Sequence, residues 1–290
     1  MRPNGVGLNS SKRAVLVSDA IRCACRLDVL ADKPGNVSLG SPGHGMTASD
    51  FLRSGAVCAP LLAQARRGVG SGVLDAMRAS IAITNCNTNL GIVLLAAPLA
   101  RAAMLPDAKV GLRHRLAFVL ENLTLEDSTH VFAAIRRADP GGLGRAPEQD
   151  VAVEPTLALK DVMQLAAGRD RIAYQYVNNF EDVFEIGLPA LRAYRERLDS
   201  LVCAVTGVYL KMLARHLDSH IVRKHGADKA REVRAAAQAL ESDFKACENP
   251  ATLADELNAF DRKLKKEGVN PGTSADLTVA TVLALLLQHL

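Results

Sequence analysis

The sequence predicts an all-α protein in which one compact, multi-helix domain follows a short tail. Hydrophobic residues make up 49% of its 290 residues, yet aromatic residues make up only 4% and tryptophan is absent. Small aliphatic side chains suit close helix packing, whereas sheets draw more heavily on aromatic and β-branched residues. Apolar positions recur with helical spacing, and no run alternates as a half-buried strand does. We expect a flexible tail over 1–11 and a helical domain over 12–290.

Capping residues and helix breakers divide the helical domain into elements. Thr47 with Asp50, and Thr124 with Asp127, have the spacing of a capping box, so each pair predicts a helix start. Pro140 and the glycines around it must end the second of these helices. Shorter helices follow residue 155. The longer helices are expected at 15–31, 47–67, from 71, 90–104, 107–122, 124–138, 189–216, 218–225, 228–247, 249–266 and 273–290.

Charge and cysteine content exclude several classes of protein. The net charge is only +4, and no block of like charges indicates a nucleic-acid tail or a basic membrane patch. The apolar runs at 90–104 and 277–287 are shorter than the roughly 18–20 residues needed to span a bilayer. Six cysteines without a regular framework, and a start without an apolar signal core, predict reduced thiols in the cytoplasm.

Familiar nucleotide-binding motifs are not found. Gly68–Val–Gly–Ser–Gly72 resembles part of a dinucleotide loop, but it joins two expected helices and no strand precedes it. The dinucleotide fingerprint requires that strand, so a linker is the better interpretation. There is also no P-loop. A nucleotide would therefore have to bind a helical scaffold, in the breaks between apolar helices.

Two polar clusters lie in the first helix breaks. In 33–37, Lys33 precedes proline and is held extended, while Gly35 and Asn36 suit a tight turn; His44 follows nearby. The second cluster, 87–91, lies at the N-terminus of the most apolar helix, where exposed backbone amides favour binding of an anion. Capping and turn chemistry also explain both clusters, so the two interpretations stay open.

A third cluster, 218–226, is basic. On one continuous helix His216, His220 and Lys224 would stack on one face, with Arg223 beside them. Two histidines four residues apart can chelate a metal, but no third ligand is in obvious range. A phosphate-facing surface is the more favoured functional interpretation, and a plain solvated helix is the alternative.

A fourth cluster, 270–276, leads into the last apolar helix. Thr273 and Asp276 again have capping-box spacing, which would by itself explain both residues. The same structural explanation covers Asp50. On spacing alone, neither aspartate is a catalytic residue.

Taken together in this order, the clusters resemble the triphosphoribosyl-dephospho-CoA synthase family, over about residues 20–285. The KPG and PGxSAD segments are the most diagnostic. The matching segments are Leu27–Asp28–Val29, Lys33–Pro–Gly–Asn–Val37, His44 with Asp50–Phe51, Asn87–Thr88 with Gly91, Asp218, and Pro271–Gly–Thr–Ser–Ala–Asp–Leu277.

The chain also departs from the family pattern. Members that make the citrate lyase precursor typically read N-T-H-K-G where this chain has N-T-N-L-G, so Asn89 and Leu90 replace a His and a Lys. Asp28 stands where Glu is common, and Asn36 where Leu is frequent. The N-T-N-L-G form resembles a divergent branch found in archaea and in one-carbon-metabolising bacteria.

The resemblance implies that ATP donates a triphosphoribosyl group. Adenine leaves, and the 2′-hydroxyl of 3′-dephospho-CoA attacks ribose C1, where oxocarbenium charge develops as in glycosidases. It implies catalytic roles for Asp28, His44 and Asp50, and Mg²⁺ held by Asp218 and Asp276. The implied ligand-binding residues are Lys33, Asn36, Asn87, Thr88, Asn89, His220, Arg223, Lys224 and Ser274.

Two other functions remain open. A paralogue could use ATP or another phosphorylated substrate to build a one-carbon coenzyme of the methanopterin or methanofuran type. A non-catalytic helical protein could keep the pocket only to bind a nucleotide. In each case the expected partners are ATP and a phosphorylated small molecule such as dephospho-CoA, without nucleic acid or membrane. Alanine-rich helix faces make a homodimer plausible.

Overall fold

The computed structural model describes residues 9–64, 67–106 and 110–290. Within these ranges it contains thirteen α-helices, a π-helix and a short 3-10 helix, and no strand of a sheet. Two isolated β-bridges, Ser38–Ser41 and Gly43–Met46, only tighten a loop. The prediction of an all-α fold is confirmed.

The helices are, in chain order, α1 (Ser10–Leu30), α2 (Ala48–Leu62), α3 (Val69–Thr84), α4 (Leu90–Met104), α5 (Leu112–Glu121), α6 (Leu125–Ala138), α7 (Leu159–Ala166), α8 (Arg171–Val177), the π-helix η1 (Asp182–Gly187), α9 (Leu188–Arg197), α10 (Leu201–Arg215), α11 (Ser219–Ala246), the 3-10 helix η2 (Pro250–Leu253), α12 (Ala254–Lys266) and α13 (Gly272–Leu287).

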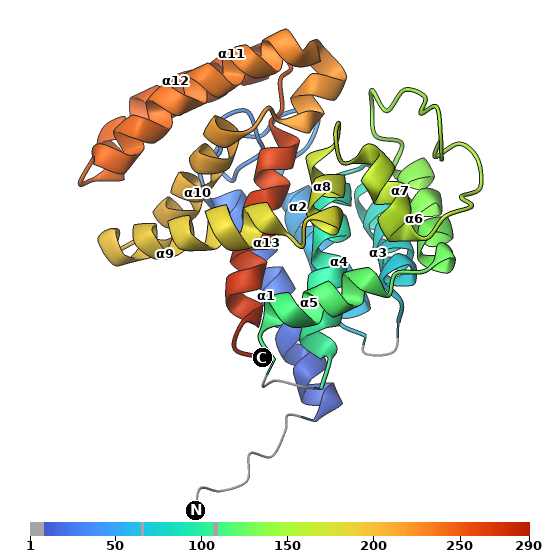
Figure 1. Cartoon of the computed structure of the whole chain (residues 1–290). Coiled ribbons are helices and arrows are strands. Elements are labelled where there is room, and N and C mark those ends of the chain that lie inside the picture. The colour runs from blue at the N-terminus through green and yellow to red at the C-terminus, as the bar shows by residue number, and fades with distance from the viewer. Residues whose placement is uncertain (1–8, 65–66, 107–109) are drawn as a thin grey trace, which may run out of the picture.

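The two most apolar helices, α4 and α13, pack against each other in the centre of the molecule (Figure 1). Every residue from Ile92 to Ala100 is buried, and so is every residue from Leu277 to Ala284. A helix that is apolar on all sides must be covered on all sides. Helices α1, α3, α5 and α10 supply that cover, and one continuous core takes side chains from α1 through α13.

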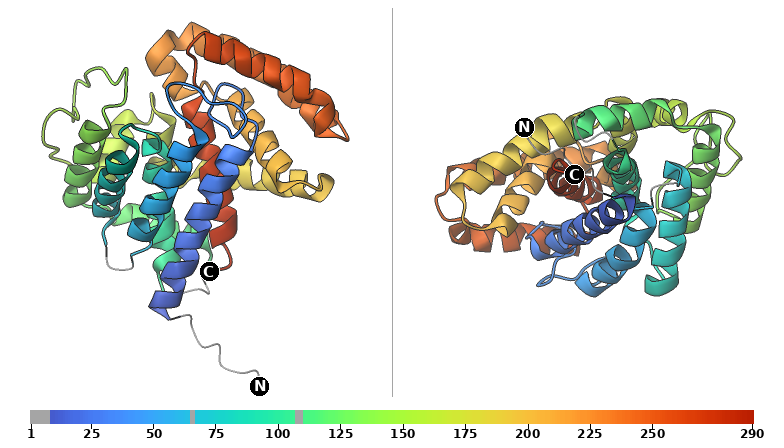
Figure 2. Two further views of the ribbon diagram at one scale, coloured as in Figure 1. Left: turned by 180° about the vertical axis from the view of Figure 1, so that it is seen from behind. Right: turned by 90° about the horizontal axis from the view of Figure 1, so that it is seen from below.

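The loops between helices gather at one end of this core. The loop at 32–46 lies beside α12 at that end, and the long loop between α6 and α7 rises on the other side (Figures 1 and 2). Asp261 of α12 accepts hydrogen bonds from the Gly35 amide at 2.8 Å and from the Ser41 hydroxyl at 2.6 Å. The polar segments are thus assembled at the ends of apolar helices.

Capping explains where several helices begin. Thr47 with Asp50, and Thr124 with Asp127, form the two capping boxes that the sequence predicts. Asn9 caps α1, so the helix begins at Ser10 and the predicted tail is too long at its end. Residues 1–8 of that tail, and the start of the helix expected from 107, lie outside the described residues.

Several predicted helices have different boundaries: the helix expected over 47–67 ends at Leu62, and the helix expected over 249–266 is the 3-10 helix η2 followed by α12. The single helix expected over 189–216 is two, because the chain is extended at Leu198 and Ser200 caps α10. The predicted break between 218–225 and 228–247 is present as a kink in α11, where Gly226 has φ 85°. No helix among the described residues combines the length and the apolar character needed to cross a membrane.

Candidate active site

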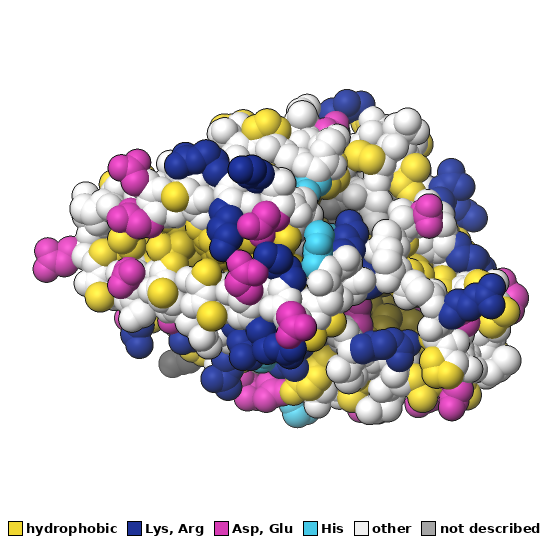
Figure 3. All heavy atoms as spheres, turned by 90° about the horizontal axis from the view of Figure 1, so that it is seen from above, with side chains coloured by type: hydrophobic (Ala, Val, Ile, Leu, Met, Phe, Trp, Pro, Cys, Tyr) yellow, Lys and Arg dark blue, Asp and Glu magenta, His cyan; other side chains and the backbone are white. Residues whose placement is uncertain are grey.

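A cavity of about 460 Å³ opens where the helix ends and loops meet. Seen from above, the surface is hollowed there, with hydrophobic side chains in the hollow and Lys and Arg side chains near its rim (Figure 3). Helices α4, α6, α7 and α8 supply one wall, and the ends of α1, α11 and α13 supply another. A concave site with both apolar and polar walls is typical of small-molecule binding.

The structure places most, but not all, of the predicted site residues on this cavity. Those that line it are Asp28, Asn36, His44, Asn87, Thr88, His220, Arg223, Lys224 and Asp276. Those that are not part of its lining are Lys33, Asp50, Asn89, Asp218 and Ser274.

The loop of the first cluster is held rigidly on the cavity wall. The buried Tyr209 hydroxyl donates to the Pro34 carbonyl at 2.6 Å. His44 donates through Nε2 to the Gly35 carbonyl at 2.8 Å. Gly35 itself has φ 82°, and a Cβ there would stand 2.8 Å from side-chain atoms of Leu264 and Pro271, so only glycine fits.

The Lys33 side chain is buried behind the cavity wall and does not line the cavity. Its ammonium is buried and donates to Asp28 Oδ1 at 2.5 Å and to Asn36 Oδ1 at 2.6 Å. Asn36 in turn donates to Asn270 Oδ1 at 2.9 Å. Burial raises the pKa of the Asp28 carboxyl, while the Lys33 ammonium favours its ionised form. The pair therefore fixes one carboxylate on the cavity wall.

Asp218 caps two helices at once. Its Oδ1 accepts from the amides of His220 and Ile221 at 3.0 and 3.1 Å, at the start of α11. Its Oδ2 accepts from the amide and hydroxyl of Ser274 at 2.7 and 2.8 Å, at the start of α13. Four donors occupy the carboxylate, so Asp218 and Ser274 join two helix ends. Among the described residues there is no cluster of three His, Cys, Asp or Glu side chains suited to a metal.

Asp276 differs from the other predicted aspartates. Its carboxylate lines the cavity, half-buried, and no hydrogen bond or ion pair to it is found within the ranges that the structure describes. The capping explanation is wrong here, because α13 begins directly after Pro271 without a capping box, and the Thr273 hydroxyl pairs instead with Ser219 at 2.9 Å. Burial raises the pKa of Asp276, and the charges of Asp28 and Asp218 raise it further. A carboxylate with a raised pKa can accept a proton.

The basic cluster is rearranged relative to its prediction. His216 is extended at the end of α10 and contacts Asp182, so it does not stack with His220. His220 lines the cavity, and its buried Nε2 has no hydrogen-bond partner. Burial, together with the nearby Arg223 and Lys224 cations, lowers the pKa of His220 to about 3. The imidazole is therefore neutral at physiological pH.

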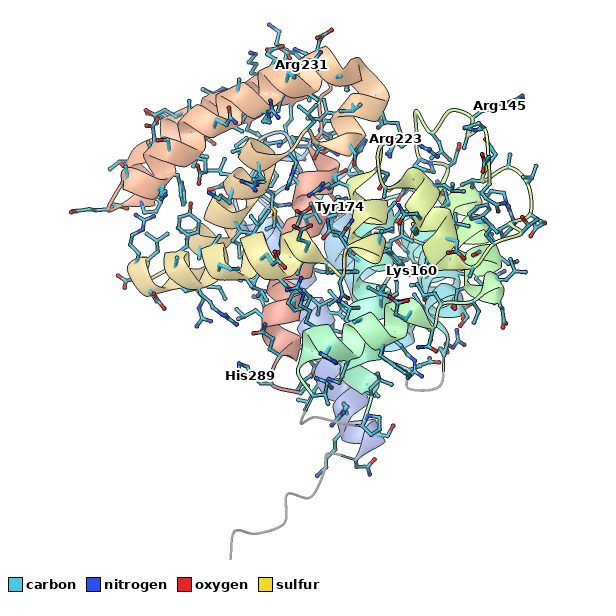
Figure 4. All side chains as sticks on the ribbon, viewed as in Figure 1. Arg145, Lys160, Tyr174, Arg223, Arg231 and His289 are labelled. Carbon is cyan, nitrogen blue, oxygen red and sulfur yellow. The ribbon has the colours of Figure 1, made fainter. Side chains whose placement is uncertain are left out.

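Arg223 and Lys224 line the cavity. Arg223 lies next to the loop between α6 and α7 (Figure 4). Arg223 donates to the Gly141 carbonyl at 3.3 Å and lies 3.7 Å from Asp170. Burial and the charge of Arg223 lower the pKa of Lys224. Two adjacent cations favour an anion locally, while Asp139, Glu148, Asp150 and Asp170 also place carboxylates on the cavity lining.

The second cluster splits between the cavity and the core. Asn87 and Thr88 line the cavity, and the buried Thr88 hydroxyl has no hydrogen-bond partner. Asn89 is buried and donates to Ser54 of α2 at 2.8 Å, so it contributes to helix packing. Asp50 accepts from the backbone and hydroxyl of Thr47 at 2.9 and 2.8 Å, which is capping chemistry.

Several lining residues were missed by the sequence analysis. The sequence predicts only that residues 139–144 end a helix, yet the loop at 139–151 contributes much of the rim. Asp170 caps α8 by accepting from the amides of Ile172 and Ala173, and it also lines the cavity. Gly91, which belongs to a segment that matches the family, was predicted without its reason: a Cβ there would lie 1.9 Å from Asp276 Oδ2. No local pattern in the sequence indicates these contacts.

A second buried cluster lies outside the cavity lining, around Asp182. Its carboxylate accepts from Arg171 at 2.6 and 2.7 Å and from Gln175 at 2.6 Å, and His216 lies 3.1 Å away. Burial alone would raise the pKa of Asp182, but His216 and Arg171 together hold it well below the usual range.

Replacing Asp182 by Asn should destabilise the fold by about 3 kcal/mol at neutral pH, because a buried charge partner is lost. A carboxyl with a lowered pKa stabilises the folded state above its unfolded pKa, and this contribution fades as the pH falls. The difference in the free energy of unfolding between wild type and D182N should therefore decrease below about pH 4. Urea unfolding at several pH values measures it; a difference that does not change with pH would contradict the ion-pair explanation.

Comparison with known proteins identifies the family. The family model for ATP:dephospho-CoA triphosphoribosyl transferase matches residues 15–290. A solved structure from Archaeoglobus fulgidus, designated a triphosphoribosyl-dephospho-CoA synthase, is 27% identical with a TM-score of 0.64. The match covers 82% of this chain and 99% of that one. No curated protein matches. The chain therefore belongs to the ATP:dephospho-CoA triphosphoribosyl transferase family, and it is a transferase.

Proposed function

We propose that this protein transfers the triphosphoribosyl group of ATP to the 2′-hydroxyl of 3′-dephospho-CoA. The bond from ribose C1 to the acceptor oxygen forms, and the bond from C1 to adenine N9 breaks. The hydroxyl loses one proton and the departing adenine gains one, so the reaction is balanced. Family membership supports the reaction class, and the observation that carries the proposal is the free carboxylate of Asp276 in a cavity that also carries the cations Arg223 and Lys224.

Asp276 is proposed to accept the proton of the attacking hydroxyl. A general base is most effective when its pKa is near the working pH, and burial with two neighbouring carboxylates raises the pKa of Asp276. It needs no rearrangement of the protein, because no protein donor among the described residues competes for its oxygens. This assignment replaces the proposed metal role for Asp276.

Asp28 is proposed to stabilise positive charge at ribose C1. Lys33 holds this carboxylate on the cavity wall at 2.5 Å, so it is oriented before the substrate binds. Fixed charges in a water-poor site stabilise a developing opposite charge more strongly than they do in water. His44 and Asn87, which also line the cavity, are proposed to contact the substrates.

The triphosphate is proposed to bind at Arg223 and Lys224. The lowered pKa of Lys224 reflects burial and the neighbouring Arg223 cation, and a polyphosphate would supply negative charge to both side chains. Mg²⁺ is expected to arrive with ATP and to be held mainly by phosphate oxygens, as is common for this ion. Asp218 has no oxygen left for it, and no step of the proposed reaction passes through a metal held by the protein.

The test is to incubate the protein with ATP, Mg²⁺ and 3′-dephospho-CoA and to separate the products by chromatography. Free adenine and an enlarged nucleotide should appear in equal amounts. D199N, which changes an exposed aspartate between α9 and α10 that does not line the cavity, serves as the control that should retain activity. Absence of adenine release, with substrate binding intact, would reject the proposed reaction.

The pH dependence of the reaction offers a separate prediction. Because the pKa of Asp276 is raised, its carboxylate should take up a proton at a pH well above that of an ordinary aspartate. The kcat/KM should therefore fall on the acidic side at a pH well above about 4. Initial rates of adenine release across pH give the profile. A profile that is flat down to pH 4 would contradict the assignment of Asp276 as the base.

A further inference from the structure

We infer that the apolar half of the cavity is a purine-binding subsite that recognises an adenine ring by its faces. This inference rests on the substrates of the proposed function, both of which carry adenine. The subsite lies between α4, α6, α7 and α8. Its wall includes Ile92, Phe132, Ile135, Val162, Met163 and Ile172.

The chemistry of this wall suits an uncharged ring. Every described side chain that these four helices contribute to the cavity is apolar, whereas the charged lining groups come from α1, α11, α13 and the loops. The Leu94 carbonyl is already occupied by the Tyr176 hydroxyl at 2.6 Å. A triphosphate or diphosphate bound here would lose its solvation without gaining partners, so charged parts of the substrates are excluded.

The position of the subsite indicates which uncharged part enters. Asp276 and the subsite meet at Gly91, where a Cβ would lie 1.9 Å from Asp276 Oδ2 and 2.9 Å from Ile172 Cδ1. A group in the subsite must therefore be bonded close to the reacting atoms. In ATP the base is attached directly to C1, and in dephospho-CoA it is attached to the carbon next to the reacting hydroxyl.

The other uncharged group, the pantetheine arm of the acceptor, does not meet this requirement. A ribose and a diphosphate separate the arm from the 2′-hydroxyl that reacts. With the hydroxyl at Asp276, the diphosphate would have to cross the apolar wall to bring the arm into the subsite. An adenine ring fits without that cost, while the phosphates extend toward Arg223 and Lys224 at the rim.

Two polar side chains of the loop between α6 and α7, Gln149 and Asp150, line the cavity but are already hydrogen-bonded within that loop. Gln149 exchanges hydrogen bonds with Thr156 at 2.8 and 2.9 Å. Asp150 accepts from the amides of Ala146 and Ala152 at 2.6 and 2.8 Å. Contact with the ring faces, through aliphatic side chains, is therefore the main recognition in this subsite.

The experiment fills the subsite and measures binding without turnover. A166F places a ring in the lining, and A167F, one residue further and outside the lining, is the matched control. Calorimetry with ATP, dephospho-CoA, ADP and inorganic tripolyphosphate gives the dissociation constants. We expect A166F to raise the dissociation constant of an adenine-bearing ligand by about tenfold or more, and to leave the dissociation constant of tripolyphosphate unchanged. I135A only removes contact area and should raise the dissociation constant of the same ligand. It provides the test if A166F does not fold.

The ligands separate the possible occupants. Weaker binding of ATP with unchanged binding of dephospho-CoA identifies the donor base. Weaker binding of dephospho-CoA and ADP with unchanged binding of ATP identifies the acceptor base, and both results support a purine subsite. Weakened dephospho-CoA with unchanged ADP would place the pantetheine arm there and overturn the inference, as would unchanged binding of all ligands. Failure of adenine release, with this binding pattern intact, would reject the proposed reaction but leave the subsite standing.

Discussion

Replacing Asp276 by Asn should reduce the rate of adenine release by on the order of 100-fold or more, without lowering the melting temperature. The amide cannot accept the hydroxyl proton. No hydrogen bond to the carboxylate is lost among the described residues, and repulsion from Asp28 and Asp218 is relieved. Stability should therefore stay the same or rise. Steady-state kinetics and thermal unfolding of the same preparation give both quantities.

D50N is the matched control for D276N. Asp50 also follows a threonine at capping-box spacing, but it accepts from Thr47 and does not line the cavity. Its replacement should lower the free energy of unfolding by about 1 kcal/mol and leave turnover nearly intact. If D276N behaved like D50N, losing stability but not activity, Asp276 would be a structural cap and the proposed base would be wrong.

Replacing Lys33 by Met should lower the free energy of unfolding by about 3–5 kcal/mol, because it leaves the Asp28 carboxylate buried without its charge partner. The Nζ atom is 2.5 Å from Asp28 Oδ1, and both side chains are at most 2% exposed. Urea unfolding measures the loss. The methionine chain retains most of the packing, so the effect reports the charge.

The double variant D28N/K33M separates the charge effect from other causes. Removing both charges avoids an unpaired buried carboxylate, so part of the lost stability should return. Activity should not return, since Asp28 is proposed to act on ribose C1. If K33M kept its stability but no longer bound ATP, Lys33 would contact the substrate directly, and its role inside the wall would be contradicted.

Local sequence patterns predicted the helices well where the determinant is local. The capping boxes at Thr47 and Thr124 are present because the side chain and the amides it satisfies lie within one turn. The same pattern was misleading at Thr273, whose hydroxyl is engaged by Ser219 of another helix. Capping spacing alone does not show which partner a side chain takes when a second helix end is adjacent.

The sequence predicted which residues belong to the site better than it predicted where their side chains point. Nine of the predicted residues line the cavity. Polar residues in breaks between apolar helices must lie at the helix ends, and the cavity opens where those ends meet. Lys33 and Asn89 were expected at the ligand but are turned inward, to Asp28 and Ser54. Whether such a polar side chain points into the protein or into the cavity depends on which hydrogen-bond partners the fold brings near it.

The sequence by itself determined the helical class, the gathering of polar residues in helix breaks and the family resemblance, because each depends on local spacing and on residue identity. The tertiary structure decided which aspartate is free. Asp50 and Asp218 are occupied by amides at helix starts, and Asp276 faces the cavity across Gly91. The three carboxylates look alike in the sequence; only the packing of α4, α11 and α13 determines which oxygens find donors and which are left for a substrate.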